Sequence, residues 1–104
     1  MWAIKNRVTE EWDSKGIRPI FHKVARGAWA SLNHAKTHVA GAIRQRNADG
    51  ETAFNWYRDA VFMEFTEEGI GQVIPVADYL KEYLQKTVEN PYHDKRYDKW
   101  LEVL

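Results

Sequence analysis

Apolar and polar residues alternate along the start of the chain, and this period of two predicts a β-strand over residues 2–8. Every second side chain of such a strand faces the same side, so one face is expected to be buried. The apolar residues on that face are Trp2, Ile4 and Val8.

A second strand is expected after a polar stretch. Residues 10–16 are mostly polar and end in Ser-Lys-Gly, which favours a hairpin turn. Residues 17–24 then predict a strand in which Ile20 packs inward, with Phe21 as a further candidate. Pro19 has no backbone N–H to donate to a neighbouring strand, so this strand is expected at an edge of the sheet.

The next pattern has the period of an α-helix. Ser31 is a favourable N-cap, and apolar side chains recur three and four residues apart over 32–46. These apolar side chains are Leu32, Ala35, Val39, Ala42 and Ile43. The sequence Asn-Ala-Asp-Gly at 47–50 is expected to stop this helix and form a loop.

A long β-like run occupies residues 54–65. Its centre, Val-Phe-Met at 61–63, is apolar on both faces, which predicts a central strand that is covered on both sides. Glu-Glu-Gly at 67–69 favours a turn, and residues 70–74 are expected to return as a short antiparallel strand.

Two helical patterns close the chain. Pro75 suits the first turn of a helix, and the apolar stripe over 76–88 predicts a strongly amphipathic one. Asn-Pro at 90–91 ends it. A short helix is expected in the tail, either docked on the body or offered to a partner. The apolar stripe of the tail consists of Tyr97, Trp100, Leu101 and Leu104.

The predicted order is β-β-α-β-β-α-α, an α+β fold with an antiparallel sheet of about four strands, two main helices and a short C-terminal helix. A chain of 104 residues is expected to form one domain over 1–104, with 90–104 as a helical tail. The side chains expected in the core are Leu32, Val39, Ile43, Val61, Met63, Tyr79, Leu80 and Tyr83.

Composition narrows the class of protein. Hydrophobic residues make up 44% of the chain and charged residues 29%, which is typical of a soluble globular protein. There is no cysteine, which excludes disulfides, thiolate metal sites and cysteine nucleophiles. No apolar run reaches the ~18 residues of a membrane span and no basic-then-apolar leader opens the sequence, so we expect a cytoplasmic protein without a membrane partner.

The net charge of zero conceals two oppositely charged halves. Residues 1–46 carry nine Lys and Arg against three Asp and Glu, a balance of +6, and residues 47–104 carry six against twelve, a balance of −6. Such a split can steer a charged partner, although the two halves could instead neutralise each other across the fold. Five Trp, five Tyr and four Phe also leave aromatic side chains for a binding surface.

No known catalytic motif is present, and we expect a protein that is not an enzyme and holds no cofactor or structural metal. His34 and His38 lie four residues apart on one helix face and are weak candidates for a metal pair, with two surface histidines as the alternative. A basic and aromatic set near the first helix would suit a nucleic acid or a small nucleotide, with a solvated helix face as the favoured alternative. This set consists of Arg26, Trp29, Lys36 and Arg44.

Aromatic and basic residues are also mixed in the tail, as they are at the hot spots of protein interfaces. The candidate anchors for a protein partner are Tyr92, Tyr97, Trp100 and Leu101. The alternative, of equal weight, is that the tail helix closes the core. A second copy of the chain could also be the partner, because an exposed apolar stripe beside an edge strand favours a symmetric dimer.

Several segments occur in a characteristic order after the N-terminal strand. They are Gly-Ala-Trp-Ala-Ser-Leu-Asn-His-Ala-Lys at 27–36, Val-Phe-Met-Glu-Phe at 61–65, Val-Ile-Pro-Val at 73–76 and Asp-Tyr-Leu at 78–80. Over residues 2–84 this order resembles a group of short phage-encoded proteins of unknown function. The resemblance implies a phage or prophage origin and no catalytic residue. We therefore expect a small non-enzymatic interaction module that binds and modulates or inhibits a host protein, with nucleic-acid or small-nucleotide binding as the alternative.

Overall fold

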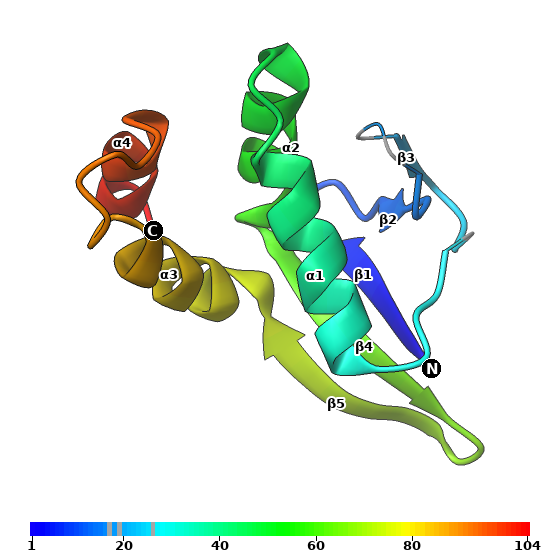
Figure 1. Cartoon of the computed structure of the whole chain (residues 1–104). Coiled ribbons are helices and arrows are strands. Elements are labelled where there is room, and N and C mark those ends of the chain that lie inside the picture. The colour runs from blue at the N-terminus through cyan, green and yellow to red at the C-terminus, as the bar shows by residue number, and fades with distance from the viewer. Residues whose placement is uncertain (17, 19, 26) are drawn as a thin grey trace.

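The computed structural model describes residues 1–104 except 17, 19 and 26 (Figure 1). The strands are β1 (Trp2–Asn6), β2 (Trp12–Asp13), β3 (Phe21–His22), β4 (Ala60–Thr66) and β5 (Gly69–Pro75). The helices are α1 (Leu32–Ile43), α2 (Ala48–Tyr57), α3 (Val76–Thr87) and α4 (Arg96–Glu102). The fold class is therefore α+β, as the sequence predicts.

The strands form one antiparallel sheet in the order β3-β2-β1-β4-β5. β1 and β4 lie at its centre and pair along the whole of β1, from Trp2 opposite Glu64 to Asn6 opposite Ala60. β4 continues through a tight turn into β5, which is the last strand on that side. The sheet has one strand more than the sequence indicates, because β2 lies in a segment expected to be a turn.

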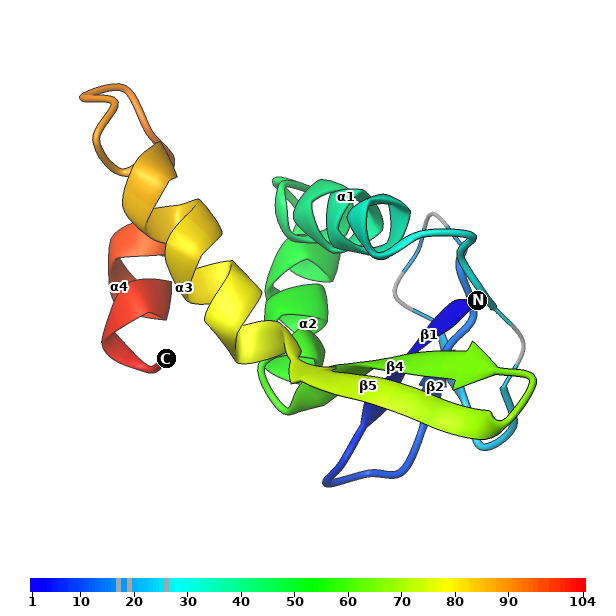
Figure 2. The same cartoon turned by 90° about the horizontal axis from the view of Figure 1, so that it is seen from below.

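The helices α1 and α2 lie on one face of the sheet (Figure 2). The core forms between that face and the helices, where Ile4, Ile43 and Phe62 are fully buried. Leu80 of α3 belongs to the same cluster. Because successive strand residues face opposite sides, the neighbours of Ile4 and Phe62 point to the other face, which α1 and α2 leave uncovered.

Helix α1 begins as predicted. The backbone N–H of His34 donates a hydrogen bond to the Ser31 hydroxyl at 3.2 Å, which satisfies one of the unpaired donors of the first turn. The buried face of α1 includes Ala35, Val39 and Ile43. The helix ends at Ile43, three residues earlier than its sequence pattern indicates.

Helix α2 shows that the loop predicted at 47–50 and the first half of the strand predicted at 54–65 are wrong. Asn47 caps a new helix, and its side chain accepts a hydrogen bond from the N–H of Asp49 at 3.0 Å. Asp49 and Glu51 place negative charge in the first turn, where it stabilises a helix. Phe54 and Tyr57 then lie on the buried side of α2. Only the second half of the predicted strand forms β4.

The strand predicted over 17–24 is reduced to the two residues of β3, and residues 17 and 19 lie outside the described part of the chain. β3 is an edge strand, as predicted. The polar stretch before it does not form the expected turn alone, because Trp12 pairs with Lys5 and adds β2 to the sheet.

Half of the predicted core is buried, and of the other half Leu32, Tyr79 and Tyr83 pack against the core cluster, whereas Met63 does not. The buried residues are Val39, Ile43, Val61 and Leu80, and the partly buried ones are Leu32, Met63, Tyr79 and Tyr83. The prediction is wrong for Val8 and Ile20, which are exposed. Val8 lies beyond the end of β1, and Ile20 precedes β3.

The C-terminal half follows the prediction closely. Gly69 closes the β4–β5 turn with φ +116°, a conformation that glycine adopts without strain. Pro75 occupies the N-cap position of α3. The tail forms α4, and Arg96 ties it to the body by donating from Nη1 to the carbonyl oxygen of Gln45 at 2.9 Å.

Candidate functional site

Strand β5 forms a free edge of the sheet. It pairs with β4 on one side, and no strand in the described part of the chain pairs with its other side. Six of its seven residues are exposed. Its sequence, Gly-Ile-Gly-Gln-Val-Ile-Pro, holds no charged residue and no proline before the last position. Charges and prolines are two of the features that protect an edge strand from pairing, and residues 69–74 carry neither.

A β-bulge fixes the register of the hairpin. Met63 pairs with Val73 but Phe65 pairs with Ile70, so β5 contains one residue more than β4 between these pairs. The carboxylate of Glu64 accepts a hydrogen bond from the extra segment, from the N–H of Gln72 at 3.2 Å. A bulge of this kind strengthens the local twist and pins the pairing.

An apolar patch covers the sheet face opposite α1 and α2. Phe65, Ile70 and Val73 are 38%, 62% and 37% exposed. The Phe65 ring lies 6.0 Å from the Trp12 ring, and Met63 is the cross-strand neighbour of Val73. We call this set the outer patch; it consists of Trp12, Met63, Phe65, Ile70 and Val73. A contiguous exposed apolar surface of this type is typical of an interaction site.

The charge around the outer patch differs between its two ends. The turn of the β4–β5 hairpin carries Glu67 and Glu68, and residues 60–75 contain no Lys or Arg. At the other end of the hairpin, Arg7 and Arg58 line a pocket together with Val73. The turn of the hairpin therefore favours a partner with positive charge beside apolar side chains.

Sequence reasoning missed this surface, although its signal was present. The pattern around 61–63 is apolar on both faces and predicts a strand covered on both sides. The helices α1 and α2 cover only one face of the sheet. On the other face Ala3 and Val61 are buried, but Met63 is half-buried and Phe65 and Val73 are exposed.

The tail residues proposed as anchors lie mostly in the core of the same chain. Tyr97 and Trp100 are 5% and 6% exposed, and the Trp100 ring stacks on Phe54 with centroids 4.5 Å apart. Leu101 is half-buried and packs against the core cluster. Tyr92 is 93% exposed. Of the two roles left open for the tail helix, the structure shows it docked, which leaves Tyr92 as the accessible ring.

The basic and aromatic set near α1 is not gathered into one surface. Arg26 lies outside the described residues. Trp29 is buried, because its backbone pairs with Trp2 on the sheet, so its ring offers no face for a base. Lys36 holds its ammonium group 5.5 Å from the centre of the Tyr79 ring, and Arg44 is exposed at the other end of α1.

The two candidate histidines have different surroundings. His34 is exposed, whereas His38 turns inward and places Nε2 3.3 Å from an Asp13 carboxylate oxygen. Among the described residues, no three His, Asp or Glu side chains come close enough to hold a metal ion together.

A buried polar cluster surrounds Asp13, whose side chain is almost completely removed from solvent. The Tyr57 hydroxyl donates a hydrogen bond to this carboxylate, and so does the backbone N–H of Lys15, at 3.0 Å. Burial, and after it the adjacent Asp13 carboxylate, raises the pKa of Tyr57 well above its ordinary value of 10.0. The side chains of Asp13, His38 and Tyr57 therefore join β2 to α1 and α2.

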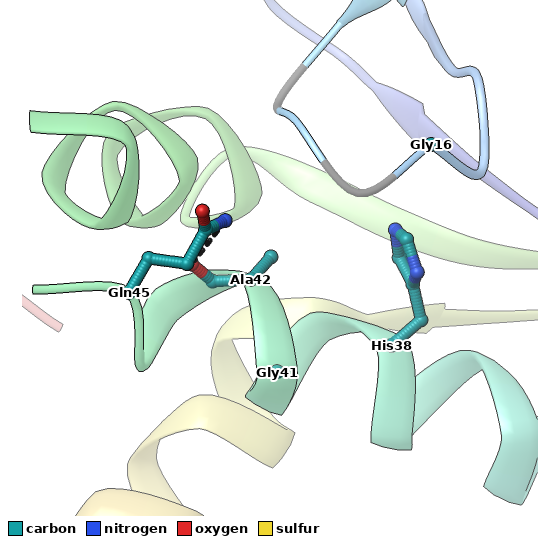
Figure 3. A pocket seen from close by; sticks show the side chains of 5 residues that line it. All are labelled: Gly16, His38, Gly41, Ala42 and Gln45. Carbon is teal, nitrogen blue, oxygen red and sulfur yellow. Dashed lines mark hydrogen bonds between the residues drawn. The ribbon is translucent and has the colours of Figure 1, made fainter. Parts of the chain in front are cut away.

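An open pocket of about 320 Å³ lies beside this cluster, between α1 and the segment around Gly16 (Figure 3). The described residues that line it have small side chains, except His38 and Gln45. The His38 ring points from α1 towards the Gly16 segment, with Asp13 holding one ring nitrogen. This arrangement could orient an imidazole as an acid or base, and His38 is the one titratable group in the described lining.

Comparisons with known proteins identify no relative: no family model, no curated protein and no solved structure matches the chain. The resemblance to phage-encoded proteins therefore stays a prediction. Within the described residues, no helix is both long enough and apolar enough to cross a membrane.

Proposed function

We propose that this protein is a small non-enzymatic interaction module that binds an extended segment of a partner protein along the free edge of β5. The observation that carries the proposal is an exposed, uncharged edge strand beside the outer patch. An edge strand offers main-chain hydrogen bonds to an added strand, and alternate side chains of that strand contact the neighbouring face.

The chemistry of the hairpin defines the partner segment. Its alternate apolar side chains would lie next to Ile70 and Val73, extending the outer patch across one more strand. Lys or Arg residues beside them would approach Glu67 and Glu68 at the turn. The partner is therefore an apolar and basic segment, attracted by the negative charge of the hairpin.

The sequence resemblance supports a host protein as the source of this segment. A phage-encoded module that occupies a host segment would modulate or inhibit the protein that contains it. From the tail, Tyr92 is the exposed aromatic residue that could add a second contact.

Selection from a random peptide library on the purified protein tests the proposal. The enriched peptides are expected to alternate apolar residues and to carry Lys or Arg. Val73→Arg places a bulky cation in the outer patch and should weaken binding of an enriched peptide at least about tenfold, or 1.4 kcal/mol. Val8→Arg is the matched control, because Val8 is 74% exposed in the turn after β1, and it should bind normally.

Three results would contradict the proposal. They are no enrichment, equal binding by both variants, and enriched peptides that are acidic. Sedimentation of the free protein separates a partner segment from a second copy, since self-pairing at β5 would give a dimer that Val73→Arg dissociates. The nucleic-acid alternative instead predicts a salt-sensitive mobility shift that Lys36→Gln and Arg44→Gln reduce.

A further inference from the structure

A second site of different chemistry lies between α2 and α4. A pocket of about 310 Å³ opens between these helices. α2 and its C-cap residue contribute Phe54 and Arg58, and α4 contributes Arg96, Lys99 and Trp100. This volume is at the lower end of the range for small-molecule pockets, so it suits a small ligand.

The apolar wall of the pocket is rigid. The rings of Phe54 and Trp100 stack with centroids 4.5 Å apart and planes 5° from parallel. The guanidinium group of Arg96 lies over Trp100 at 5.0 Å from the ring centre, and its other contacts hold it in place. It donates to the Asp94 carboxylate and to the carbonyl oxygen of Gln45. The aromatic wall is therefore preformed in the structure without a ligand.

Two cations at the pocket lack a strong partner. Lys99 makes no ion pair or hydrogen bond within the described part of the chain. The Nε atom of Arg58 is 3.9 Å from the Asp59 carboxylate, at the outer limit of an ion pair, and both side chains are more than a third exposed. Glu51 is the single acidic residue in the described lining. The described lining therefore holds three cations against one carboxylate, in an otherwise acidic half of the sequence.

We propose that the pocket between α2 and α4 binds a small organic phosphate. A phosphate monoester carries close to two negative charges at neutral pH, which matches the pair of Arg58 and Lys99. The carbon part of the ligand would lie at the rim of the aromatic wall, where the buried rings of Phe54 and Trp100 reach the pocket. Because Phe54 stacks on the Trp100 ring and the Arg96 guanidinium group lies over that ring, the wall suits a compact group beside it better than a stacked base.

The test uses phenyl phosphate as the probe. Phenol and inorganic phosphate are the controls, because each contains only one of the two parts of phenyl phosphate. Titration followed by the indole N–H signal of Trp100 in NMR spectra should show saturable binding of phenyl phosphate. Phenol should cause no saturable shift, and inorganic phosphate should bind at least about tenfold more weakly than phenyl phosphate. Added salt should weaken phenyl phosphate binding, since the recognition is electrostatic.

Charge-removing variants identify the site. Lys99→Gln and Arg58→Gln should each weaken phenyl phosphate binding about fivefold to tenfold. Lys81→Gln removes the same charge from an exposed position on α3 outside the lining and should bind normally. The proposal is overturned by an unsaturable shift up to about 10 mM ligand, by equal effects of all three variants, or by phosphate binding as tightly as phenyl phosphate. Ile70→Arg changes an exposed residue of the outer patch that shares no pocket lining with Arg58, and it should not change phenyl phosphate binding. This test is therefore independent of the β5 edge.

Discussion

Asp13 shows how one side chain can fasten two layers of this fold. A carboxylate so far from water is costly unless hydrogen bonds replace its solvation. Tyr57 from α2, His38 from α1 and the backbone N–H of Lys15 supply those partners. The short strand β2, which has only two residues in the sheet, is therefore held to the helices through Asp13.

The Asp13–Tyr57 contact can be measured directly. Tyr57→Phe removes one hydrogen bond to a buried charge and should lower the free energy of unfolding by about 1.5–3 kcal/mol. Asp13→Ala leaves both the Tyr57 hydroxyl and the Lys15 N–H without their acceptor, and should cost about 3 kcal/mol or more. Urea denaturation at neutral pH gives both values.

Tyr83→Phe provides the matched control, because the Tyr83 hydroxyl donates no hydrogen bond within the described residues. Its effect should stay within about 0.5 kcal/mol. Equal losses for Tyr57→Phe and Tyr83→Phe would show that the contact with Asp13 contributes nothing to stability.

This cluster could not be predicted from the sequence. Tyr57 is 44 residues from Asp13 along the chain, and their contact depends on the packing of α2 against β2. The pattern assigned Asp13 to a polar turn and Tyr57 to a strand, so neither was expected near His38. The four-residue spacing identified His38 only as a partner of His34 in a candidate metal pair. It could not show that the buried Asp13 carboxylate would contact the His38 ring nitrogen.

At the scale of elements, the docking of α4 depends on the loop that leads into it. Both ring nitrogens of His93 face acceptors: Nε2 is 3.0 Å from the Asp98 carboxylate, and Nδ1 is 2.7 Å from the carbonyl oxygen of Asn90. The doubly protonated ring satisfies both, so the Asp98 carboxylate first, and the Asn90 carbonyl next, raise the pKa of His93 above 6.5. The Arg96 guanidinium lowers the pKa of the Asp94 carboxyl below 3.8.

These two shifts give the tail a defined pH window. Because the pKa of His93 is raised in the fold, its contribution is complete below pH 6.5 and is lost as the pH rises through the folded pKa. Because the pKa of Asp94 is lowered, its contribution is complete above pH 3.8 and is lost as the pH falls through the folded pKa. Hydrogen-exchange protection of α4 should therefore be greatest between these values.

His93→Gln should remove the decline in α4 protection on the alkaline side of that window. His34→Gln should keep it, because His34 is exposed on α1 and far from the tail in sequence. An unchanged alkaline decline in His93→Gln would assign the effect to another group.

Elements with one strong local pattern were predictable, and those with two competing patterns were not. The stripe of α3, the cap of α1 and the β4–β5 turn are each specified by residues close together in sequence. Asn47 is different, because asparagine favours both the end of a helix and the N-cap of the next. Phe54 and Tyr57 suit a strand as well as a helix, and only the packing of α2 against the sheet decides between them.

At the scale of the whole molecule, the two charged halves form no direct ion pair with each other among the described residues. Every ion pair in the described part of the chain joins two residues of the same half, either within 1–46 or within 47–104. The mutual neutralisation considered for the sequence does not take place through direct pairs. The β4–β5 hairpin therefore keeps its negative charge for a partner, which is the electrostatic basis of the proposed function.

A single hydrophobic core contains residues from both ends of the chain. Trp2 at the N-terminus and Trp100 near the C-terminus belong to one hydrophobic cluster, and Arg96 links α4 to the carbonyl oxygen of Gln45 at the end of α1. Because the tail shares this core and does not form one of its own, we expect it to unfold together with the sheet.

Cooperative unfolding can be tested with two probes that report on different parts of the molecule. Far-UV circular dichroism follows all helices and strands, whereas tryptophan fluorescence reports the surroundings of Trp2 and Trp100, among others. The two urea transitions should coincide, with a slope of about 1–3 kcal/mol per molar urea. Arg96→Ala, which removes the link to Gln45, should move both transitions to lower urea together, and Lys95→Ala beside it should move neither. An early fluorescence transition that Arg96→Ala alone advances would instead make residues 90–104 a separately unfolding unit.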